Sequence, residues 1–298
     1  MVLPAYNAQT FIEEAVNSIL GQSLPDFELI IINDGSSDGT GTLLERIGDP
    51  RLRVLTLPEN SGTATAVSKG YGLASGEFIA HMDADDISEP DRLARQVAFL
   101  RRYPAVTVLG SAMTFFGEQT GRAAVPLTDA KIKSALLSGV GNIYNPTAMF
   151  RRRLVSEKGV RCEPSRKGVF DWDFWISALL AGAKFANLPE PLLRYRVHMK
   201  QQSRDLSSMY AIAGQVRERL LRVYFPTLGA AELAAIGPLL QRLNGPGLAR
   251  EAVRAGLAAI DKALKYQKPS KFGEDRDDLQ HFLRTRGAAW EKALAASS

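Results

Sequence analysis

The sequence predicts an α/β fold with a mostly parallel, doubly wound sheet and a C-terminal helical extension. Over the first 110 residues, short apolar runs of strand length alternate with segments whose apolar residues recur at helical spacing. This alternation favours right-handed crossovers between parallel strands, with helices on both faces of the sheet. From about residue 205 the pattern becomes helical throughout. We therefore expect one α/β domain over residues 1–204 and a helical extension over residues 205–298.

The expected elements follow one another closely. Only Val2 and Leu3 precede Pro4, so we expect a shortened first strand, followed by a helix near residues 11–20. The run FELIII at 27–32 is apolar enough to form a strand buried on both faces. The remaining expected strands lie at 54–57, 78–82 and 106–109, and the remaining helices at 43–47, 63–74, 91–103, 128–138 and 171–182.

Composition excludes several classes of protein. The chain has 298 residues, of which 45% are hydrophobic and 23% charged, which are ordinary globular values. The single cysteine, Cys162, cannot form an internal disulfide. No run of about 18 apolar residues occurs, and the N-terminus lacks the basic and apolar segments of an export signal. We therefore expect a cytoplasmic protein.

Positive charge is concentrated in the last third of the chain. Residues 1–198 carry 21 Lys and Arg against 22 Asp and Glu, whereas residues 199–298 carry 16 against 10. Such an excess is typical of a solvated helical surface, and it also suits an anionic membrane surface. We expect no nucleic-acid partner, and peripheral contact of the C-terminal helices with the inner face of the membrane is a hypothesis.

Acidic residues follow two of the expected strands directly. Asp34 comes after the strand at 27–32, and Asp83, Asp85 and Asp86 come after the strand at 78–82. In an open parallel sheet, ligands bind beyond the carboxyl ends of the strands. Converging carboxylates repel one another unless a cation lies among them, and Mg²⁺ prefers one or two carboxylates together with phosphate oxygens. These residues predict a site for a metal-bound diphosphate.

Several motifs together resemble glycosyltransferase family 2, whose members have the GT-A fold. The resemblance covers about residues 1–200 and rests on their order and spacing: PAYN at 4–7, NDGSSDGT at 33–40, NSG at 60–62, DADD at 83–86, PDRL at 90–93, FDWDFW at 170–175 and LLRYRVH at 192–198. It implies an inverting, metal-dependent transfer of a sugar from a nucleoside diphosphate sugar, by preference a UDP-sugar, to an acceptor hydroxyl. The saccharide or lipid-linked acceptor would belong to polysaccharide or glycolipid biosynthesis.

The resemblance also implies roles for individual residues. Residues 1–110 would form the half that binds the nucleotide sugar, and residues 111–204 the acceptor half. Asp85 and His198 would hold Mn²⁺ or Mg²⁺, and Asp171 would be the general base. The residues expected to bind the donor are Pro4, Tyr6, Asn7, Asp34, Lys69, Asp83 and Asp85.

Some positions depart from the family pattern. An arginine usually found after the Asn-x-Gly loop is missing, and Lys69 is the candidate replacement for its phosphate contact. Asp173 is a rival to Asp171 as the base, because two acids stand in FDWDFW. Other residues also have two interpretations. His81 is expected to be a core histidine rather than a ligand, whereas Trp172 and Trp175 fit either an acceptor platform or the core.

Two other functions remain as alternatives. A nucleotidyltransferase also uses an α/β sheet and metal-binding carboxylates, but its glycine-rich phosphate loop is absent from the segment PAYNAQTFIEEA. A dehydrogenase is disfavoured because no G-x-G-x-x-G follows the first strand. A catalytically degenerate subunit that binds nucleotide sugars is the non-enzymatic alternative. Metal-dependent turnover separates it from an enzyme.

Overall fold

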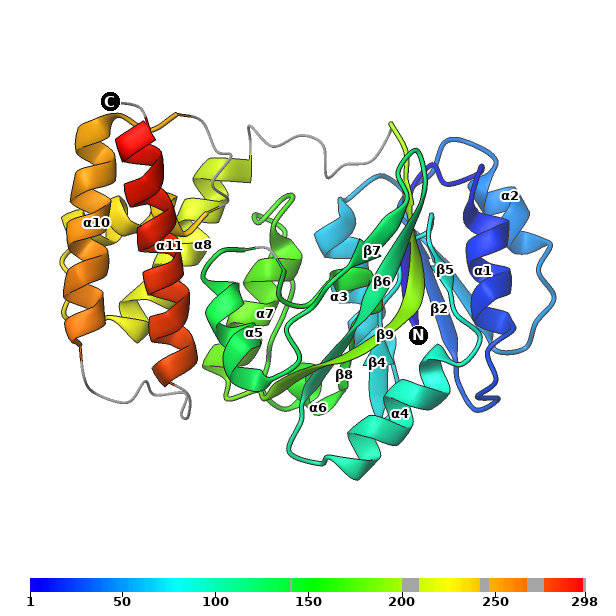
Figure 1. Ribbon diagram of the computed structural model, residues 1–298. Helices are drawn as coiled ribbons and strands as arrows, with labels where there is room; N and C mark the ends of the chain where they lie inside the picture. The colour runs from blue at the N-terminus through cyan, green and yellow to red at the C-terminus, as the bar shows by residue number, and fades with distance from the viewer. Residues whose placement is uncertain (140, 200–208, 242–246, 267–275, 297–298) are drawn as a thin grey trace. The chain divides into compact units, whose positions relative to one another are not determined.

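The computed structural model describes residues 1–139, 141–199, 209–241, 247–266 and 276–296 (Figure 1). The chain divides into two compact units. The sheet unit comprises residues 1–127 and 143–205, and the helical unit comprises residues 128–142 and 206–298. The boundary expected at 204/205 lies outside the described residues. A difference from the sequence-based division is that residues 128–142, placed there in the acceptor half, belong to the helical unit.

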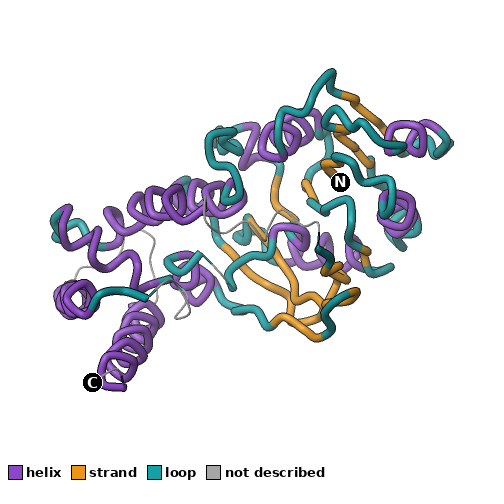
Figure 2. Tube along the Cα trace, turned by 90° about the horizontal axis from the view of Figure 1, so that it is seen from above, coloured by secondary structure: helices purple, strands orange, loops and turns teal. Residues whose placement is uncertain are grey.

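The first half of the sheet unit is a parallel three-stranded sheet of order β1-β2-β3. Its strands are β1 (Val2–Ala5), β2 (Leu29–Asn33) and β3 (Leu52–Thr56), joined through α1 (Ile12–Leu20) and α2 (Thr40–Glu45). Every residue of β1 and β2 is buried, as the FELIII run predicts for a strand covered on both faces. Figure 2 shows these strands among the helices of the unit.

The first strand runs through Pro4, whereas the sequence suggested that it would end before this residue. Met1 O and Ala5 O accept hydrogen bonds from the β2 side, and Val2 O accepts one from Met82 N–H on the other side. Backbone groups of successive residues face opposite sides of a strand, so the backbone nitrogen of Pro4 faces away from β2. It faces the side where a single parallel bridge, Val2 to His81, joins the two sheets. A proline is tolerated where no ladder hydrogen bond is required of it.

The second half of the sheet unit is a mixed sheet of order β4-β8-β6-β9-β5, with β7 paired to β6. Its strands are β4 (Phe78–Ala80), β5 (Ile87–Ser88), β6 (Val108–Gly117), β7 (Gly121–Ala123), β8 (Met149–Arg151) and β9 (Phe185–Val197). Only β6 and β9 pair in parallel here. The α/β fold class is confirmed. The parallel pairing predicted from residues 1–110 is found for β1–β3 and for the bridge, whereas β4 and β5 pair antiparallel with their neighbours, and so does β6 with β7 and β8.

Helices complete the sheet unit. They are α3 (Thr63–Leu73), α4 (Arg92–Arg102), α6 (Arg153–Ser156) and α7 (Phe170–Leu180), with a short 3₁₀ turn, η1, at Asn145–Thr147. Apolar spacing predicts three of them, α3, α4 and α7, whereas α6 and the 3₁₀ turn were not predicted. Helix α3 packs closely on β1, because a Cβ atom at Gly70 would lie 2.4 Å from Val2 Cγ1. Glycine at this position permits the close approach of helix and strand.

The described regular elements of the helical unit are all helices: α5 (Asp129–Leu136), α8 (Met209–Tyr224), α9 (Ala230–Leu240), α10 (Arg250–Lys265) and α11 (Arg276–Ala296). Helices α9 and α10 meet where Gly256 faces Leu239, and Trp290 Nε1–H of α11 donates to Leu239 O at 2.9 Å. Buried Arg217 donates to the carbonyls of Leu137 and Ser138 that follow α5. In the described part of the chain, no helix is both long and apolar enough to cross a membrane.

Candidate active site

The loops that follow β1 and β2 are tied together by their own polar side chains. Asn7 Oδ1 accepts a hydrogen bond from Ser37 N–H at 2.9 Å, and Asn7 N–H donates to the Ser36 hydroxyl at 3.0 Å. Asn7 has φ = 48°, a left-handed conformation that asparagine tolerates better than most residues. Asn7 therefore shapes the turn after β1, while the neighbouring Tyr6 is 43% exposed at the same sheet edge and Pro4 stays buried in the strand.

Asp34 joins the loop after β2 to the loop that precedes α3. Its Oδ1 accepts from Ser61 N–H at 2.8 Å and its Oδ2 from Gly62 N–H at 2.9 Å, and its side chain is buried. Gly35 makes this contact possible, because its φ is +65° and a Cβ atom there would lie 2.4 Å from the backbone of Glu59. Both carboxylate oxygens thus support backbone, and an additional contact with a nucleobase remains a prediction.

The turn after β4 gathers three carboxylates. Asp83 is about one-third exposed, whereas Asp86 is fully buried and accepts from Arg196 N–H at 2.9 Å. Burial, followed by the negative charge of Asp83, raises the pKa of both Asp85 and Asp86. A cation placed among these groups would relieve their mutual repulsion, as the sequence predicts.

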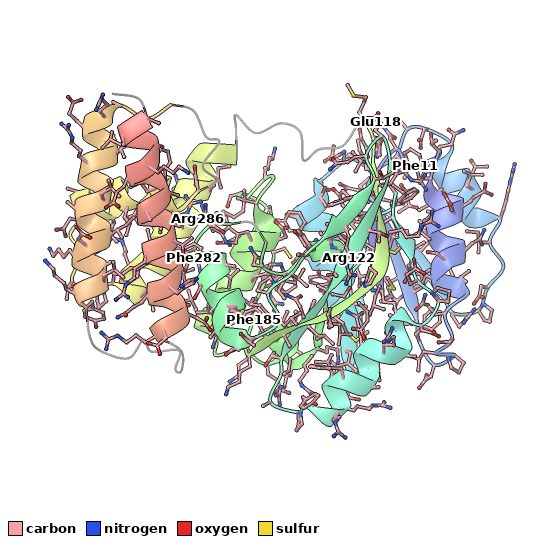
Figure 3. All side chains as sticks on the ribbon, in the orientation of Figure 1. Phe11, Glu118, Arg122, Phe185, Phe282 and Arg286 are labelled. Carbon is pink, nitrogen blue, oxygen red and sulfur yellow. The ribbon has the colours of Figure 1, made fainter. Side chains whose placement is uncertain are left out.

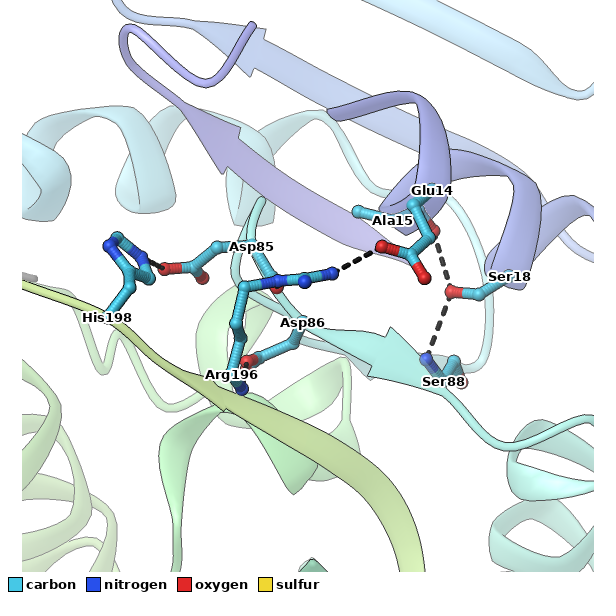
Figure 4. A network of polar contacts seen from close by, with 8 residues as sticks. All are labelled: Glu14, Ala15, Ser18, Asp85, Asp86, Ser88, Arg196 and His198. Carbon is cyan, nitrogen blue, oxygen red and sulfur yellow. Dashed lines mark hydrogen bonds and ion pairs between the residues drawn. The ribbon is translucent and has the colours of Figure 1, made fainter. Parts of the chain in front are cut away.

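The end of β9 meets this turn. His198 Nε2 lies 3.0 Å from Asp85 Oδ2, and this hydrogen bond opposes the rise in the pKa of Asp85 (Figure 4). The two residues stand 113 positions apart in the sequence, and the pairing of β9 with β5 and β6 brings them together. The structure therefore places side by side the two residues that the resemblance assigns to the metal.

Arg196, two residues before His198, secures the same turn and was not singled out from the sequence. Its Nε–H donates to Asp85 O at 2.8 Å, and its guanidinium pairs with Glu14 of α1 (Figure 4). The guanidinium also lies over the rings of Phe11 and Phe116, 4.7 and 4.4 Å from their centroids. Figure 3 shows Phe11 near the C-terminal end of β9, whose first residue is Phe185. The position of Arg196 in LLRYRVH is the only signal in the sequence that could have identified it.

Asp171 lies in the first turn of α7 and interacts electrostatically with the turn after β4. Its side chain is half-buried, and burial raises the pKa of its carboxyl; the charge of Asp83 raises this pKa further. The backbone hydrogen bond from Trp172 lowers it. Asp173, the rival base, is fully buried among the residues of the same helix. Access to an acceptor therefore favours Asp171 over Asp173.

Other residues considered from the sequence now have defined surroundings. Lys69 lies on the exposed side of α3, whereas Val67, two residues earlier, is fully buried. The contribution of Lys69 to donor binding stays a prediction. Trp172 and Trp175 are both buried, which favours the core interpretation over an exposed acceptor platform. Cys162 is buried, and burial raises the pKa of its thiol, as expected for an unreactive cysteine.

The donor atoms near Asp85 suit Mn²⁺ or Mg²⁺ shared with a diphosphate. Across the described residues, no three His, Cys, Asp or Glu side chains are grouped to hold a metal by themselves. Asp85 Oδ2 and His198 Nε2 lie 3.0 Å apart and could offer a metal one oxygen and one nitrogen ligand. Such a pair leaves coordination positions for phosphate oxygens and water, which is the mode of binding that Mg²⁺ prefers.

Sequence comparisons identify relatives over about two thirds of the chain. A protein from Haemophilus influenzae described as an uncharacterized glycosyltransferase is 32% identical over 216 residues, covering 68% of this chain and 66% of that protein. The putative glycosyltransferase EpsE of Bacillus subtilis is 29% identical, covering 66% of this chain and 72% of EpsE. The succinoglycan biosynthesis protein ExoO of Rhizobium meliloti is 30% identical, and the match covers 61% of its length.

Solved structures share the fold, and a family pattern matches the chain. Staphylococcus aureus TarS (residues 1–349, in complex with UDP-GlcNAc) aligns with a TM-score of 0.65 at 19% identity, covering 99% of this chain and 90% of that one. A mannosyltransferase from Pyrobaculum calidifontis, in complex with GDP-Man and Mn²⁺, aligns with a TM-score of 0.54 at 18% identity, covering 100% of this chain and 74% of that one. The pattern of Glycosyl transferase family 2 matches residues 1–159, more than half of the sequence. The chain therefore belongs to glycosyltransferase family 2.

Proposed function

We propose that this protein transfers a sugar from a nucleoside diphosphate sugar to an acceptor hydroxyl, with inversion at the anomeric carbon and dependence on a divalent metal. The observation that carries the proposal is the meeting of Asp85 with His198, next to Asp83, at the carboxyl end of β4. A metal cation bound together with a diphosphate suits these carboxylates better than either group alone. The cation offsets the negative charge of both the carboxylates and the diphosphate.

The donor would lie along the loops after β1, β2 and β4. The nucleoside would contact the segment from Pro4 to Asn7 and the loop that Asp34 supports, while the diphosphate would approach Asp83 and Asp85. The bound metal would act as a Lewis acid on the departing diphosphate, with Asp85 and His198 as its protein ligands. The structure of TarS with UDP-GlcNAc supports a UDP-sugar as the donor, and the Mn²⁺ of the mannosyltransferase supports the metal.

The acceptor side of the reaction would use Asp171. A single displacement needs one base that removes the proton of the acceptor hydroxyl, and such a base contributes about 10²–10⁴-fold to the rate. The raised pKa of Asp171 brings its basicity closer to that of a useful base near neutral pH. A double displacement would require a carboxylate nucleophile at the anomeric carbon, and the proposal assigns none.

Polysaccharide or glycolipid assembly is the proposed setting. ExoO is named for succinoglycan biosynthesis, and TuaG of Bacillus subtilis, 41% identical over 102 residues, is named a putative teichuronic acid biosynthesis glycosyltransferase. The acceptor would be a saccharide or a lipid-linked saccharide. For a lipid-linked acceptor, the basic C-terminal helices would favour peripheral contact with the cytoplasmic face of the membrane.

A thermal-shift screen of UDP- and GDP-sugars with Mn²⁺, followed by a transfer assay with the sugars that bind, tests this proposal. A ligand that binds only the folded state at about 100 times its Kd stabilises it by about 2.7 kcal/mol. We expect a stabilising donor, metal-dependent turnover in the wild type and loss of this metal-dependent turnover in Asp85→Asn. Binding without turnover would identify a nucleotide-sugar-binding subunit instead, and the absence of any binding would reject the proposal.

A further inference from the structure

A buried polar chain lies directly beneath the turn after β4. Tyr71 of α3 places its hydroxyl 3.3 Å from His81 Nδ1, and His81 Nε2 lies 3.1 Å from Asp83 Oδ1. His81 is fully buried, Tyr71 nearly so, and the Asp83 side chain is 36% exposed. The expectation of a core histidine is therefore confirmed by its burial, but one ring nitrogen of this core residue faces a carboxylate of the donor site.

The two contacts fix which ring nitrogen carries the proton. An ionised carboxylate can only accept, so Nε2 must donate to Asp83. In the neutral imidazole Nδ1 is then an acceptor, which requires Tyr71 to donate its hydroxyl proton. Burial raises the pKa of Tyr71 well above its ordinary value, so the hydroxyl keeps this proton. Asp83 thereby selects the Nε2–H tautomer, and the Tyr71 hydroxyl supports it by donating to Nδ1.

The surrounding structure holds the histidine in place. His81 N–H donates to Ala148 O at 2.9 Å, and buried Arg92 donates through Nη2 to His81 O at 2.6 Å. The ring of Tyr71 packs on Phe150 of β8 and Phe174 of α7, with centroids 5.0 and 5.6 Å apart. A carboxylate attached to such a rigid support has fewer orientations available than a free one.

We propose that His81 is a positioning residue that orients the Asp83 carboxylate for the donor through its Nε2–H, with Tyr71 supporting this tautomer by donating to Nδ1. The inference rests on the proposed function, because it assigns Asp83 to donor binding. Asp83 Oδ1 is engaged by His81, and the Asp83 side chain is 36% exposed, so its second oxygen is the one left for a donor. Phe174, packed on Tyr71, stands three residues after Asp171 on α7.

Three variants separate this role from simple core packing. His81→Met removes the N–H while retaining a side chain of similar size, His81→Gln offers an amide N–H in its place, and Tyr71→Phe removes only the hydroxyl. Loss of a partner that orients a ligand-binding group costs about 10–100-fold in affinity. We expect Kd for the UDP-sugar, measured by calorimetry with Mn²⁺, to rise by that factor in His81→Met and by about 3–10-fold in Tyr71→Phe. Most of the loss should be recovered in His81→Gln.

A double-mutant cycle with Asp83→Asn shows whether the effect passes through Asp83. If it does, His81→Met should change donor affinity far less in the Asp83→Asn background than in the wild type. The KM for the acceptor should not change, because the donor carboxylate is the group disturbed. Lower melting temperatures in all variants with an unchanged donor Kd would overturn the inference while leaving the proposed function intact. A wild type that binds no nucleotide sugar would overturn both.

A spectroscopic measurement remains decisive even if His81→Met does not fold. The ¹⁵N chemical shifts of the imidazole distinguish the two neutral tautomers, and His81→Gln assigns the signal among the three histidines of the chain. We expect the Nε2–H tautomer in the wild type and a change in its population in Tyr71→Phe. A proton on Nδ1 with Nε2 unprotonated would contradict the inference.

Discussion

The donor side and the acceptor side of the candidate site are built in different ways. On the donor side, Asn7 and Asp34 follow strands directly and fix neighbouring loops through hydrogen bonds to their backbone. From the acceptor half of the sequence, the proposed base Asp171 and the proposed metal ligand His198 lie on α7 and at the end of β9, elements that long-range packing brings to the turn after β4. Local contacts thus shape one side of the site, and tertiary contacts place the other.

This difference implies two patterns of sensitivity. Substitutions on the donor side should disturb the folding of the loops together with donor binding, because the residues proposed to bind the donor also fix these loops. Substitutions of Asp171 should change turnover while donor binding is retained, because the residues proposed to bind the donor lie on other elements. The predictions below test this contrast, starting with the largest expected effect.

Asp171→Asn should lower turnover by about 10²–10⁴-fold, because the amide cannot accept the proton of the acceptor hydroxyl. The Kd for the donor should stay close to that of the wild type. Steady-state kinetics together with calorimetry of donor binding measure the two quantities separately.

Asp173→Asn is the matched control on the same helix. Its carboxyl is fully buried, so we expect its main effect on stability rather than on the chemical step. If folded Asp173→Asn lost turnover while Asp171→Asn kept it, the assignment of the base would be reversed.

Arg196→Lys should weaken metal-dependent donor binding by about 10-fold, in line with other residues that orient a ligand. Lysine keeps a positive charge near Glu14, but it lacks the Nε–H that donates to Asp85 O and the planar group that stacks on Phe11. The control is Arg95→Lys, which alters an exposed ion pair with Glu190. Equal donor affinities in both variants would show that the turn after β4 does not depend on β9.

Asp34→Asn should destabilise the protein by about 1–3 kcal/mol, because an amide NH₂ would face a backbone N–H that now has the buried carboxylate as its acceptor. Chemical denaturation measures the free energy of unfolding. Asp49→Asn is the control, since among the described residues the Asp49 carboxylate bonds only the nearby Arg51, at a partly exposed position. An Asp34→Asn protein as stable as the wild type would argue against a structural role for the carboxylate.

The pH profile of kcat/KM should show an acid limb above the ordinary aspartate pKa of about 3.9, because burial and the charge of Asp83 raise the pKa of Asp171. The base must be ionised, so activity falls as pH falls through the raised value. The same shift in the pKa of Asp171 means that the folded state binds this proton more tightly than the unfolded state. The protonated group therefore contributes its full stability below about pH 3.9, the ordinary aspartate pKa, and this contribution is lost as pH rises through the raised pKa.

Asp171→Asn should accordingly be slightly more stable than the wild type at neutral pH, where the wild type holds an ionised carboxylate in a poorly solvated position. Thermal unfolding of both proteins as a function of pH checks the sign. A variant that is less stable than the wild type at neutral pH would contradict the assigned direction of the shift.

The smallest expected effect concerns the C-terminal segment, whose 16 Lys and Arg against 10 Asp and Glu over residues 199–298 favour anionic surfaces. We expect weak co-sedimentation with anionic lipid vesicles at low salt. It should be lost near 0.1 M salt, where the Debye length falls to about 10 Å. No association at low salt would reject the membrane contact.

The positions of the loops on the donor side could be predicted better than those of the residues that join them from far along the chain. Asp34 and Asp83 follow apolar strands, so the strand pattern alone predicts loops beyond the carboxyl ends of these strands. Nothing local could show that His198 meets Asp85 or that Arg196 bonds the same turn, because the 13-residue β9 and its register determine both contacts. The burial of His81 was predicted from its apolar neighbours, whereas its contact with Asp83 depends on the orientation of a ring that no pattern records.

Antiparallel pairing and the placement of residues 128–142 could not be predicted for the same reason. Both depend on which segments meet after residue 110, where strands and helices no longer alternate regularly. Pro238 is a smaller exception to a local rule. Proline usually breaks the interior of a helix, yet this residue lies inside the last turn of α9, where it removes a single intrahelical donor.

Crystals of the protein with UDP and Mn²⁺, measured at a wavelength where manganese scatters anomalously, test the central claim most directly. The account predicts one strong anomalous peak between the diphosphate and the Asp85 carboxylate, within coordination distance of His198 Nε2, that disappears in Asp85→Asn. A peak bound to other residues, or UDP bound at this edge of the sheet without manganese, would contradict it.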